Sequence, residues 1–571
     1  KEPLWIVLSL AMIILVDLLI IFLTNSIRVG SVIVPFVLFI FAVVVCVVYE
    51  FRGIPMMAPD ILTVQTATSV MGNYTFKLTF EQYSVILVCM AFFFTFLRLH
   101  EVKVTEKRVF HIAGFIVVAL GCGLFTNQII LSDFMEEHQI NIRMFRPMES
   151  YQKYGGVLTF ARSVGYAVVK KPEGYSTAKV DQIIQEYEKK SANAQQSTAK
   201  QYPNIITVVN ETFADIKVLG DFKTNEDYMP YFHSLKKNCV TGYTYASIVG
   251  GQTANTEFEL LTGNTLGFLS AGTTAFQLYI HGQMPSLVSN LKAEGYSGNK
   301  AMHPFNPYNY NRPAVYKDFG FTDFIDKFDF PKNVKRVREY ISDEANVDRI
   351  ISEYEKNRKK TDQPFYMYNM TIQNHSPYDK DAANFKQPIK IESSKYDAEA
   401  NRYLNLIKYS DDSLKQLTSY FEKCKEPTII LFLGDHQPRL TDEFMNKITN
   451  GQYQTWSSEQ MMKRYQVPFV IWANYDIKEQ HIEKTSMNYM QSILTQTAGV
   501  KMTGYQRFLN EVRKEVPTIT SQGYWGKNGK FYQINDKGSP YYGIIQKYRM
   551  IQYNMMFDKK NRRDSFFEVS K

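Results

Sequence analysis

Two segments that lie far apart in the chain carry side chains able to bind a metal ion. The apolar run 428–433 is followed by a glycine and then by Asp435-His436, and the apolar run 205–209 is followed by an asparagine and then by Glu211. Each run has the length and composition of a buried β-strand. Ligands of open α/β sheets bind where strands end, so we expect Glu211, Asp435 and His436 to clamp one divalent cation. Such a site indicates metal-dependent phosphoryl transfer.

A third segment offers a nucleophile. Residues 249–259 begin with glycines and then have helical character, and the free backbone N–H groups at such a helix start can hold a phosphate. Thr253 lies near this start, and its hydroxyl could attack phosphorus if a metal ion activated it. Threonine is also a common N-cap, so the residues alone leave both roles open.

Three further side chains stand where a substrate could be held. His303 lies in a polar, turn-like segment, and His375 follows the predicted strand 365–371. Arg312 has the donor geometry to bind a phosphate with two parallel hydrogen bonds. Each has an ordinary alternative, because an isolated histidine is usually structural and most arginines are solvated.

The apolar content of this 571-residue chain is concentrated near its start. Four long apolar runs occur there, at 4–23, 32–48, 83–97 and 110–131. About 20 apolar residues span a bilayer; three runs meet this length, and the run 83–97 meets it only with its flanking residues. We therefore predict a multi-span α-helical membrane domain in residues 1–131.

Basic residues predict the orientation of these helices. The loop after the third run holds four of them, namely Arg98, Lys103, Lys107 and Arg108. Such loops remain in the cytoplasm, so the fourth helix leaves the cell and the rest of the chain lies outside. Counted backwards, Lys1 would also lie outside. We therefore expect a fifth helix upstream of Lys1, with a non-native N-terminus as the alternative.

The outer part is expected to contain a connector and a large catalytic domain. Residues 132–201 are helical and polar and end in a linker, in which Ala192-Asn193-Ala194 is similar to a protease site. In residues 202–571, apolar runs of strand length alternate with amphipathic stretches. This alternation predicts an α/β domain with a mainly parallel sheet between layers of helices.

Individual elements of the outer domain can also be placed. We predict strands at 205–209, 365–371, 428–433 and 468–472. We predict helices at 284–294, 347–356, 395–420 and 458–463, a hairpin at 523–532 and a closing helix at 540–557. No Walker or G-x-G-x-x-G loop follows a predicted strand, so we expect no nucleotide cofactor of those kinds and no nucleic-acid partner. The five cysteines do not form a disulfide framework, which favours a bacterial surface over an animal secretory pathway.

The motifs taken together resemble those of the lipoteichoic acid synthase family, in the sulfatase branch of the alkaline phosphatase superfamily. The resemblance is carried by Asn210-Glu211, Gly251-Gln252-Thr253, Asn374-His375 and Gly434-Asp435-His436. It extends to residues 51–55 with Asp60, and to residues 171–176, 261–263 and 551–554. It therefore covers nearly the whole chain.

The resemblance implies a role for each candidate residue. Glu211, Thr253, Asp435 and His436 would bind one Mn²⁺ or Mg²⁺, with Thr253 as the nucleophile. The glycerol phosphate group would be contacted by His303, Tyr310, Arg312 and His375. His375 would also be the proton donor or acceptor. The chain departs from the family pattern at Gln252, Asn255 and Tyr310, where Lys, Asp and Trp are common, and these departures concern substrate details.

The implied reaction moves glycerol phosphate from phosphatidylglycerol to an acceptor through a phosphothreonine intermediate and releases diacylglycerol. The acceptor would be lipoteichoic acid, a glycolipid anchor, a polyglycerol phosphate chain or a wall glycan, at the outer face of a bacterial cell membrane. Transfer of phosphoethanolamine or another phospholipid head group is an alternative, as is a non-catalytic membrane scaffold. A sulfatase would need a Cys or Ser in a C/S-x-P-x-R motif, and none stands at the nucleophile position.

Overall fold

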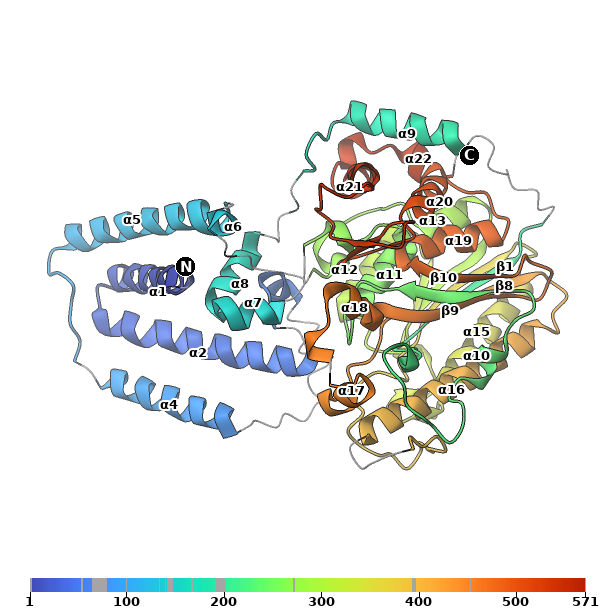
Figure 1. The fold of residues 1–571 in the computed structure, drawn as a ribbon, viewed down its shortest axis with the longest axis horizontal. Helices are drawn as coiled ribbons and strands as arrows, with labels where there is room; N and C mark the ends of the chain where they lie inside the picture. Colours follow the sequence, from blue (N-terminus) through green and yellow to red (C-terminus); the bar gives the residue numbers. More distant parts are fainter. Residues whose placement is uncertain are drawn as a thin grey trace. The chain divides into compact units, whose positions relative to one another are not determined.

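The computed structural model shows two compact units, and each is considered by itself (Figure 1). It describes residues 3–52, 55–63, 80–98, 100–132, 134–138, 140, 147–165, 169, 171–191, 201–270, 273–392, 397–451 and 453–569. The helical unit comprises residues 1–64, 70–169 and 270–273, and the α/β unit comprises 65–69, 170–269 and 274–571. The expected protease site at Ala192-Asn193-Ala194 and residues 53–54 of the membrane-domain motif lie outside the described residues.

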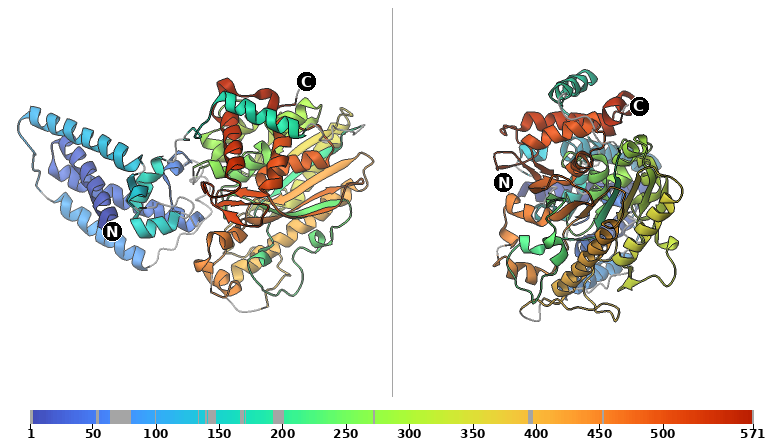
Figure 2. Two further views of the ribbon diagram at one scale, coloured as in Figure 1. Left: turned by 45° about the horizontal axis from the view of Figure 1, so that its top comes forward. Right: turned by 90° about the vertical axis from the view of Figure 1, so that its right-hand side faces the viewer.

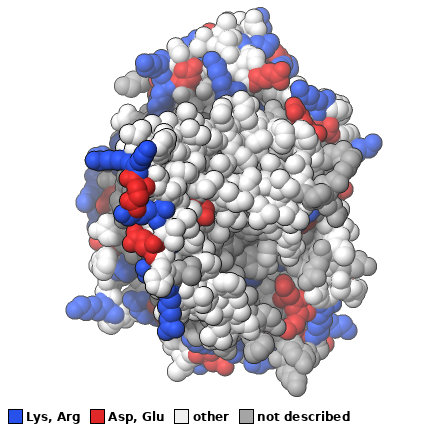
Figure 3. All heavy atoms as spheres, turned by 90° about the vertical axis from the view of Figure 1, so that its left-hand side faces the viewer, with Lys and Arg blue, Asp and Glu red and all other residues white. Residues whose placement is uncertain are grey.

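The helical unit contains the predicted membrane helices. Its long helices are α1 (Pro3–Thr24), α2 (Ile27–Arg52), α4 (Phe80–Leu97) and α5 (Arg108–Phe125), the last continued by the π-helical η2 (Thr126–Ile130). Among the described residues, three stretches are long and apolar enough to cross a membrane: Leu4–Thr24, Ile27–Tyr49 and Arg108–Ile130. The fourth predicted run forms α4, whose apolar stretch Ile86–Leu97 is shorter, so a fourth span stays a prediction. Figure 3 shows a broad area free of charged side chains on the face turned to the viewer.

The predicted connector does not form one structural element. Its short helices α6 (Phe134–Glu137), α7 (Pro147–Tyr154) and α8 (Gly156–Gly165) belong to the helical unit, as does η1 (Ala58–Thr63). Helix α9 (Thr177–Ser191) instead belongs to the α/β unit. Val180, Ile183 and Tyr187 of α9 are buried there, and Arg563 donates two hydrogen bonds to Asp181.

An eight-stranded sheet forms the centre of the α/β unit, in the order β10-β2-β9-β8-β1-β7-β3-β4. These strands are β1 (Asn204–Asn210), β2 (Cys239–Tyr245), β3 (Ser297–Met302), β4 (Asp323–Ile325), β7 (Phe365–Met370), β8 (Thr428–Gly434), β9 (Gln466–Ala473) and β10 (Gln480–Ser486). Within this sheet β9 runs antiparallel to its neighbours β8 and β2, and the other pairs are parallel. The prediction of a mainly parallel sheet is confirmed.

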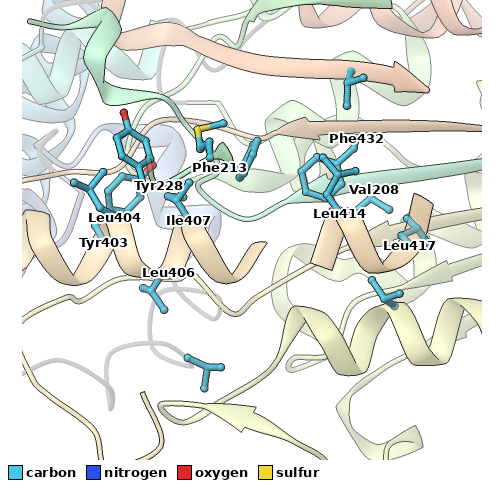
Figure 4. Packing of buried hydrophobic residues seen from close by; sticks show 14 of the residues in the cluster. Val208, Phe213, Tyr228, Tyr403, Leu404, Leu406, Ile407, Leu414, Leu417 and Phe432 are labelled. Carbon is cyan, nitrogen blue, oxygen red and sulfur yellow. The ribbon is translucent and has the colours of Figure 1, made fainter. Parts of the chain in front are cut away.

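Helices cover both faces of this sheet (Figures 1 and 2). One face carries α10 (Pro230–Ser234), α15 (Asp343–Arg358), α16 (Ala398–Phe421) and α17 (Asp442–Ile448). The other carries α11 (Thr253–Thr262), α12 (Ala275–Leu278), α13 (Leu287–Ala293), α19 (Met490–Thr497), α20 (Gly504–Glu515), α21 (Tyr542–Met556) and α22 (Asp564–Phe567). Figure 4 shows the core under the first face, where Leu414 and Leu417 of α16 pack with Val208 and Phe432 of the strands.

The remaining elements are short. Two small antiparallel pairings are β5 (Arg336–Val337) with β6 (Tyr340–Ile341), and β12 (Gly523–Trp525) between β11 (Thr518–Thr520) and β13 (Phe531–Tyr532). The other short helices are α14 (Arg312–Phe319), α18 (Ser458–Met461), η3 (Ile216–Val218), η4 (Leu266–Phe268), η5 (Asn309–Asn311), η6 (Lys327–Asp329), η7 (Tyr453–Thr455), η8 (Met462–Tyr465), η9 (Met487–Tyr489) and η10 (Lys559–Asn561).

The four predicted strands are confirmed as β1, β7, β8 and β9, and the predicted hairpin as β12 with β13. The helix predicted at 284–294 begins later, at Leu287, because Ser286 is its N-cap and accepts a hydrogen bond from Ser289 N. A proline precedes this cap, which disfavours helix before it. Strands β2, β3, β4 and β10 were not predicted.

Candidate active site

Four neighbouring parallel strands end where predicted site residues lie. Asp435 follows β8, Glu211 follows β1 and His303 follows β3, while His375 stands shortly after β7. In the register of β1 with β8, Asn210 pairs with Gly434, so Glu211 and Asp435 are the next residues along each strand. The carboxyl ends of parallel strands share one edge of a sheet. The fold therefore gathers these side chains at that edge.

Glu211, Asp435 and His436 form a buried cluster whose ligand atoms lie within 4.8 Å of one another. His436 Nε2 lies 3.2 Å from Asp435 Oδ2 and 3.9 Å from Glu211 Oε1. Burial raises the pKa of Glu211 well above its ordinary value, and the charge of Asp435 raises that pKa further. Two buried carboxylates this close disfavour each other's ionised form unless positive charge lies between them.

The hydrogen bonds around His436 show that this cluster presents lone pairs. His436 Nδ1 lies 2.9 Å from the Gln437 carbonyl oxygen, which can only accept, so Nδ1 carries a proton, and in the neutral imidazole Nε2 holds the lone pair. Asp435 Oδ1 already accepts from the backbone N–H groups of Thr212 and His436, each at 2.7 Å. Among the described residues, the buried Asp435 Oδ2 and His436 Nε2 have no hydrogen-bond partner. With a neutral His436 these two acceptors face one another, which is the form in which they can bind a cation.

The dimensions of the cluster fit a divalent cation. Bonds of roughly 2.1 Å to one ion place neighbouring ligand atoms about 3.0 to 3.5 Å apart. The 3.2 Å separation of Asp435 Oδ2 from His436 Nε2 and the 3.5 Å separation of Thr253 Oγ1 from Glu211 Oε2 lie in this range. Oxygen donors with one imidazole suit Mn²⁺ and are compatible with Mg²⁺. These four residues therefore fit the ion that the resemblance implies.

Thr253 is the first residue of α11, and its hydroxyl lies beside Glu211 of the cluster. The alternative role of Thr253 as N-cap is wrong, because Gln252 occupies that position and makes no side-chain capping bond. Gly250, Gly251 and Gln252 have φ of 69°, 149° and 63°. Such a conformation costs a non-glycine residue about 1–2 kcal/mol and is typical of functional sites. The chain thus makes a strained turn in order to present Thr253.

Hydrogen bonds join this turn to the metal-ligand loop. Gly250 N donates to the Gln437 carbonyl oxygen at 3.0 Å, and Thr256 Oγ1 donates to the Asp435 carbonyl oxygen at 2.8 Å. A Cβ atom at Gly434 would lie 1.9 Å from a neighbouring backbone oxygen, so only glycine fits before Asp435. The proposed nucleophile and ligands are therefore held in one rigid arrangement.

A buried polar network supports the strand end that carries Glu211. Asn374 Nδ2 donates to the Glu211 carbonyl oxygen at 3.0 Å and lies 2.8 Å from Ser410 Oγ. Asp343 Oδ2 accepts from Asn210 Nδ2 at 2.7 Å and from Ser410 Oγ at 2.6 Å. The network ties the end of β1 to the segment that holds His375.

His303 and His375 are each held in one tautomer. Nδ1 of His303 lies 3.0 Å from the Met370 carbonyl oxygen, and Nδ1 of His375 lies 2.7 Å from the Ser376 carbonyl oxygen. Both Nδ1 atoms therefore donate, and both Nε2 atoms are left as acceptors. Burial lowers the pKa of His375 to about 4 and holds the pKa of His303 well below its usual range, where the charge of Arg312 adds to the effect. Both imidazoles are neutral at pH 7 and can accept a proton.

Arg312 is buried and paired with Glu257. Its Nε and Nη2 lie 3.1 and 2.7 Å from Glu257 Oε1, and the hydroxyls of Tyr316 and Tyr368 donate to Oε2. The Tyr310 ring centroid lies 5.1 Å from the guanidinium carbon, and Tyr310 has a left-handed φ of 59°. Glu257 thus offsets part of the positive charge. Direct contact of Arg312 and Tyr310 with a substrate stays a prediction.

Glu257 and Asp343 were missed by reasoning from the sequence. Glu257 stands one helical turn after Thr253, so its spacing gave a weak signal that both face the same way. Asp343 is the first residue of α15, and an acidic residue is favourable at any helix start. Nothing in the sequence therefore distinguishes this ordinary role from its role in the polar network under Glu211.

Comparisons with known proteins agree with this fold and site. The profile of the sulfatase family matches residues 203–500, just over half of the chain. A Rhizobium meliloti (strain 1021) protein named for cyclic β-1,2-glucan modification is 30% identical over 433 residues, 74% of this chain and 65% of that protein. The lipoteichoic acid synthase of Staphylococcus saprophyticus is 23% identical over 374 residues, 63% of this chain and 55% of that protein. The chain therefore spans less than two thirds of the length of these curated relatives.

Solved structures with a similar fold include a bacterial transferase. The Streptococcus pyogenes phosphoglycerol transferase GacH, in complex with sn-glycerol-1-phosphate, superposes with a TM-score of 0.57 at 20% identity. The match covers 70% of this chain and 100% of that chain. At this identity the likeness concerns the fold, and it confirms the architecture that the resemblance implied.

Proposed function

Because the chain belongs to the sulfatase family and has lipoteichoic acid synthases among its relatives, we propose that it is a metal-dependent phosphotransferase of a bacterial cell membrane. It transfers glycerol phosphate from phosphatidylglycerol to lipoteichoic acid or a related cell-surface glycopolymer, and it releases diacylglycerol. The α/β unit works outside the cell. The relative named for glucan modification supports an acceptor that contains carbohydrate.

The observation that carries this proposal is the set of converging lone pairs beside a threonine hydroxyl. Asp435 Oδ2 and His436 Nε2 face each other at 3.2 Å, and Thr253 Oγ1 lies at the same cluster. When bound there, Mn²⁺ or Mg²⁺ supplies charge that lowers the pKa of the threonine hydroxyl and neutralises phosphoryl oxygens.

The first step loads Thr253. Its Oγ1 forms a bond to phosphorus, and the bond from phosphorus to the diacylglycerol oxygen breaks. The hydroxyl proton ends on the released diacylglycerol, so charge and atoms balance. The start of α11 holds the head group through backbone N–H groups of its first residues, and the strained turn at Gln252 keeps Oγ1 directed at phosphorus.

The second step unloads Thr253 onto the acceptor. An acceptor hydroxyl oxygen forms the new bond to phosphorus, and the bond from phosphorus to Thr253 Oγ1 breaks. His375 Nε2 takes the acceptor proton, which then ends on Thr253. The low pKa of His375 and its donating Nδ1 keep Nε2 available as a base. His303 accepts a hydrogen bond from the glycerol hydroxyl groups.

The proposal is tested with the purified full chain in lipid vesicles. Labelled phosphatidylglycerol, Mn²⁺ and either a glycolipid or a glucan acceptor are supplied, and diacylglycerol and labelled acceptor are measured. We expect both products from the wild type and neither from Thr253→Val, which keeps the shape of the side chain. Turnover of phosphatidylethanolamine instead would assign the alternative donor. No lipid turnover, or equal turnover by Thr253→Val, would refute the proposal.

A further inference from the structure

A hairpin distant in sequence fastens the segment that contains His375. Arg338 lies between β5 and β6 and has a left-handed φ of 55°. Its guanidinium donates to three carbonyl oxygens of one short segment: Nη2 to Gln373 at 2.9 Å and to His375 at 2.7 Å, and Nη1 to Pro377 at 2.6 Å. One side chain thus donates to the carbonyl oxygens of His375 itself, of a residue before it and of a residue after it.

This segment has no regular structure of its own. Residues 371–380 form neither helix nor strand, so their carbonyl groups have no ladder of backbone partners. Buried backbone oxygens need donors, and a planar guanidinium can supply several in fixed directions. Arg338 therefore fixes the His375 backbone from one side, together with the Asn374 network and the bond from His375 N to the Ile372 carbonyl oxygen.

Arg338 is itself held from several sides. Its guanidinium carbon lies 5.3 Å from the centroid of the Tyr340 ring and 5.7 Å from that of Tyr378. Its backbone N–H donates to Asn384 Oδ1 at 3.1 Å, and its carbonyl oxygen accepts from Asn384 Nδ2 at 2.9 Å. The left-handed backbone, the aromatic rings and the amide leave the side chain little freedom. Such pre-organisation suits a residue that sets the position of another.

We propose that Arg338 is the positioning residue of His375, and that it thereby determines the rate at which the group on Thr253 is transferred to the acceptor. This inference rests on the proposed function, in which His375 takes the proton of the acceptor hydroxyl. Arg338 touches neither the proposed nucleophile nor the metal ligands in any recorded contact among the described residues. It acts through the backbone of 373–377, and loading of Thr253 does not depend on it.

The charge of Arg338 also favours His375 as a base, because it lowers the pKa of the imidazole. Arg338 and Arg312 are the permanent charges that act on His375, and each disfavours the protonated imidazole; His436 would act in the same direction when protonated. His303 also lies close enough to interact. Removal of one positive charge raises the pKa of His375 towards its ordinary value, so the acid limb of acceptor transfer should move to higher pH.

The test separates the two half-reactions in the full chain in vesicles. Release of diacylglycerol without acceptor, measured in a single turnover, reports loading of Thr253; label in the acceptor reports unloading. For Arg338→Met we expect unloading to slow by about 10- to 100-fold, because general-base catalysis contributes at least this much, with loading within about 3-fold of wild type. Added guanidinium should restore part of the loss in Arg338→Ala.

Arg336 of the same hairpin is the matched control. It is exposed, and its recorded hydrogen bond goes to the Glu339 carbonyl oxygen rather than to the His375 segment. Arg336→Met removes an equal charge and should leave both half-reactions and the pH profile unchanged. If Arg338→Met does not fold, Arg338→Lys replaces it in the test. This variant keeps the positive charge but loses the planar set of donors, so we again expect slower unloading with unchanged loading.

The outcomes are distinguishable. Wild-type protein that releases no diacylglycerol would contradict the proposed function. Normal wild-type turnover with unchanged unloading in Arg338→Met, or with equal loss of both half-reactions in a folded variant, would overturn the role of Arg338. An acid limb that does not move would contradict its electrostatic part.

Discussion

Substitution of Asp435 by asparagine should stabilise the metal-free protein while it removes metal binding. Asp435 Oδ1 accepts two backbone N–H groups, and the asparagine oxygen can take over both bonds. The amide nitrogen then replaces Oδ2, which stands 3.2 Å from the lone pair on His436 Nε2. With a neutral His436 a pair of acceptors thus becomes a hydrogen bond, and Glu211 loses a neighbouring negative charge.

The expected effect can be estimated from these contacts. A new buried hydrogen bond is worth about 0.5–1.5 kcal/mol, and relief of charge repulsion adds to it. In EDTA, Asp435→Asn should therefore unfold roughly 1–2 °C above the wild type, because a unit of this size has a large entropy of unfolding. With Mn²⁺ at 100 times its dissociation constant the wild type gains about 2.7 kcal/mol and the variant gains little, so the order of stability reverses.

The assay is thermal unfolding of the full chain in detergent, with EDTA and with excess Mn²⁺. Asp411→Asn is the matched control, because both oxygens of that buried carboxylate accept backbone N–H groups, from Phe232 at 2.7 Å and Tyr231 at 2.9 Å. It should lose roughly 1–3 kcal/mol under both conditions. An Asp435→Asn variant that is less stable than wild type in EDTA, or that Mn²⁺ stabilises as it does the wild type, would refute the reasoning.

Three other side chains have distinct expected results. His375→Gln should slow transfer to the acceptor about 100-fold while diacylglycerol release without acceptor persists, and equal loss of both would show that His375 is not the base. Glu257→Gln leaves Arg312 without its counter-charge and should cost roughly 3 kcal/mol in urea unfolding; unchanged stability would contradict a buried ion pair at this position. Burial raises the pKa of Glu259 from 4.5 to about 7, so the folded protein binds this proton more tightly and its stability falls as pH rises through that interval. Glu259→Gln mimics the protonated form and should be about 3 kcal/mol more stable than wild type at pH 8 but equal to it at pH 4, whereas a pH-independent difference would contradict the raised pKa.

The centre of the site was predictable because short-range patterns encode it. Glu211 and Asp435-His436 each follow an apolar run, and a buried parallel strand is the element that such a run forms. Once those strands are neighbours in register, the side chains after them must meet. The membrane helices were predictable for a related reason, since their length and apolarity are local properties.

The surrounding contacts were not predictable, because they depend on how distant segments pack. Glu257 is an acidic residue on a helix, which usually indicates a solvated face, and only the fold brings Arg312 to it. Arg338 lies in a polar hairpin whose sequence says nothing of the carbonyl groups it meets. Strand β3 contains few residues that favour strands and forms because β7 and β4 flank it.

The most direct test of the central claim is the covalent state of Thr253 during turnover. Full-length protein is mixed with phosphatidylglycerol and Mn²⁺ without acceptor, quenched in acid and digested, and the peptide that contains Thr253 is examined by mass spectrometry. We predict one glycerophosphoryl group on the Thr253 hydroxyl, which disappears when acceptor is added and never forms in Asp435→Asn. Diacylglycerol release with an unmodified Thr253, or with the group on another residue, would contradict the account.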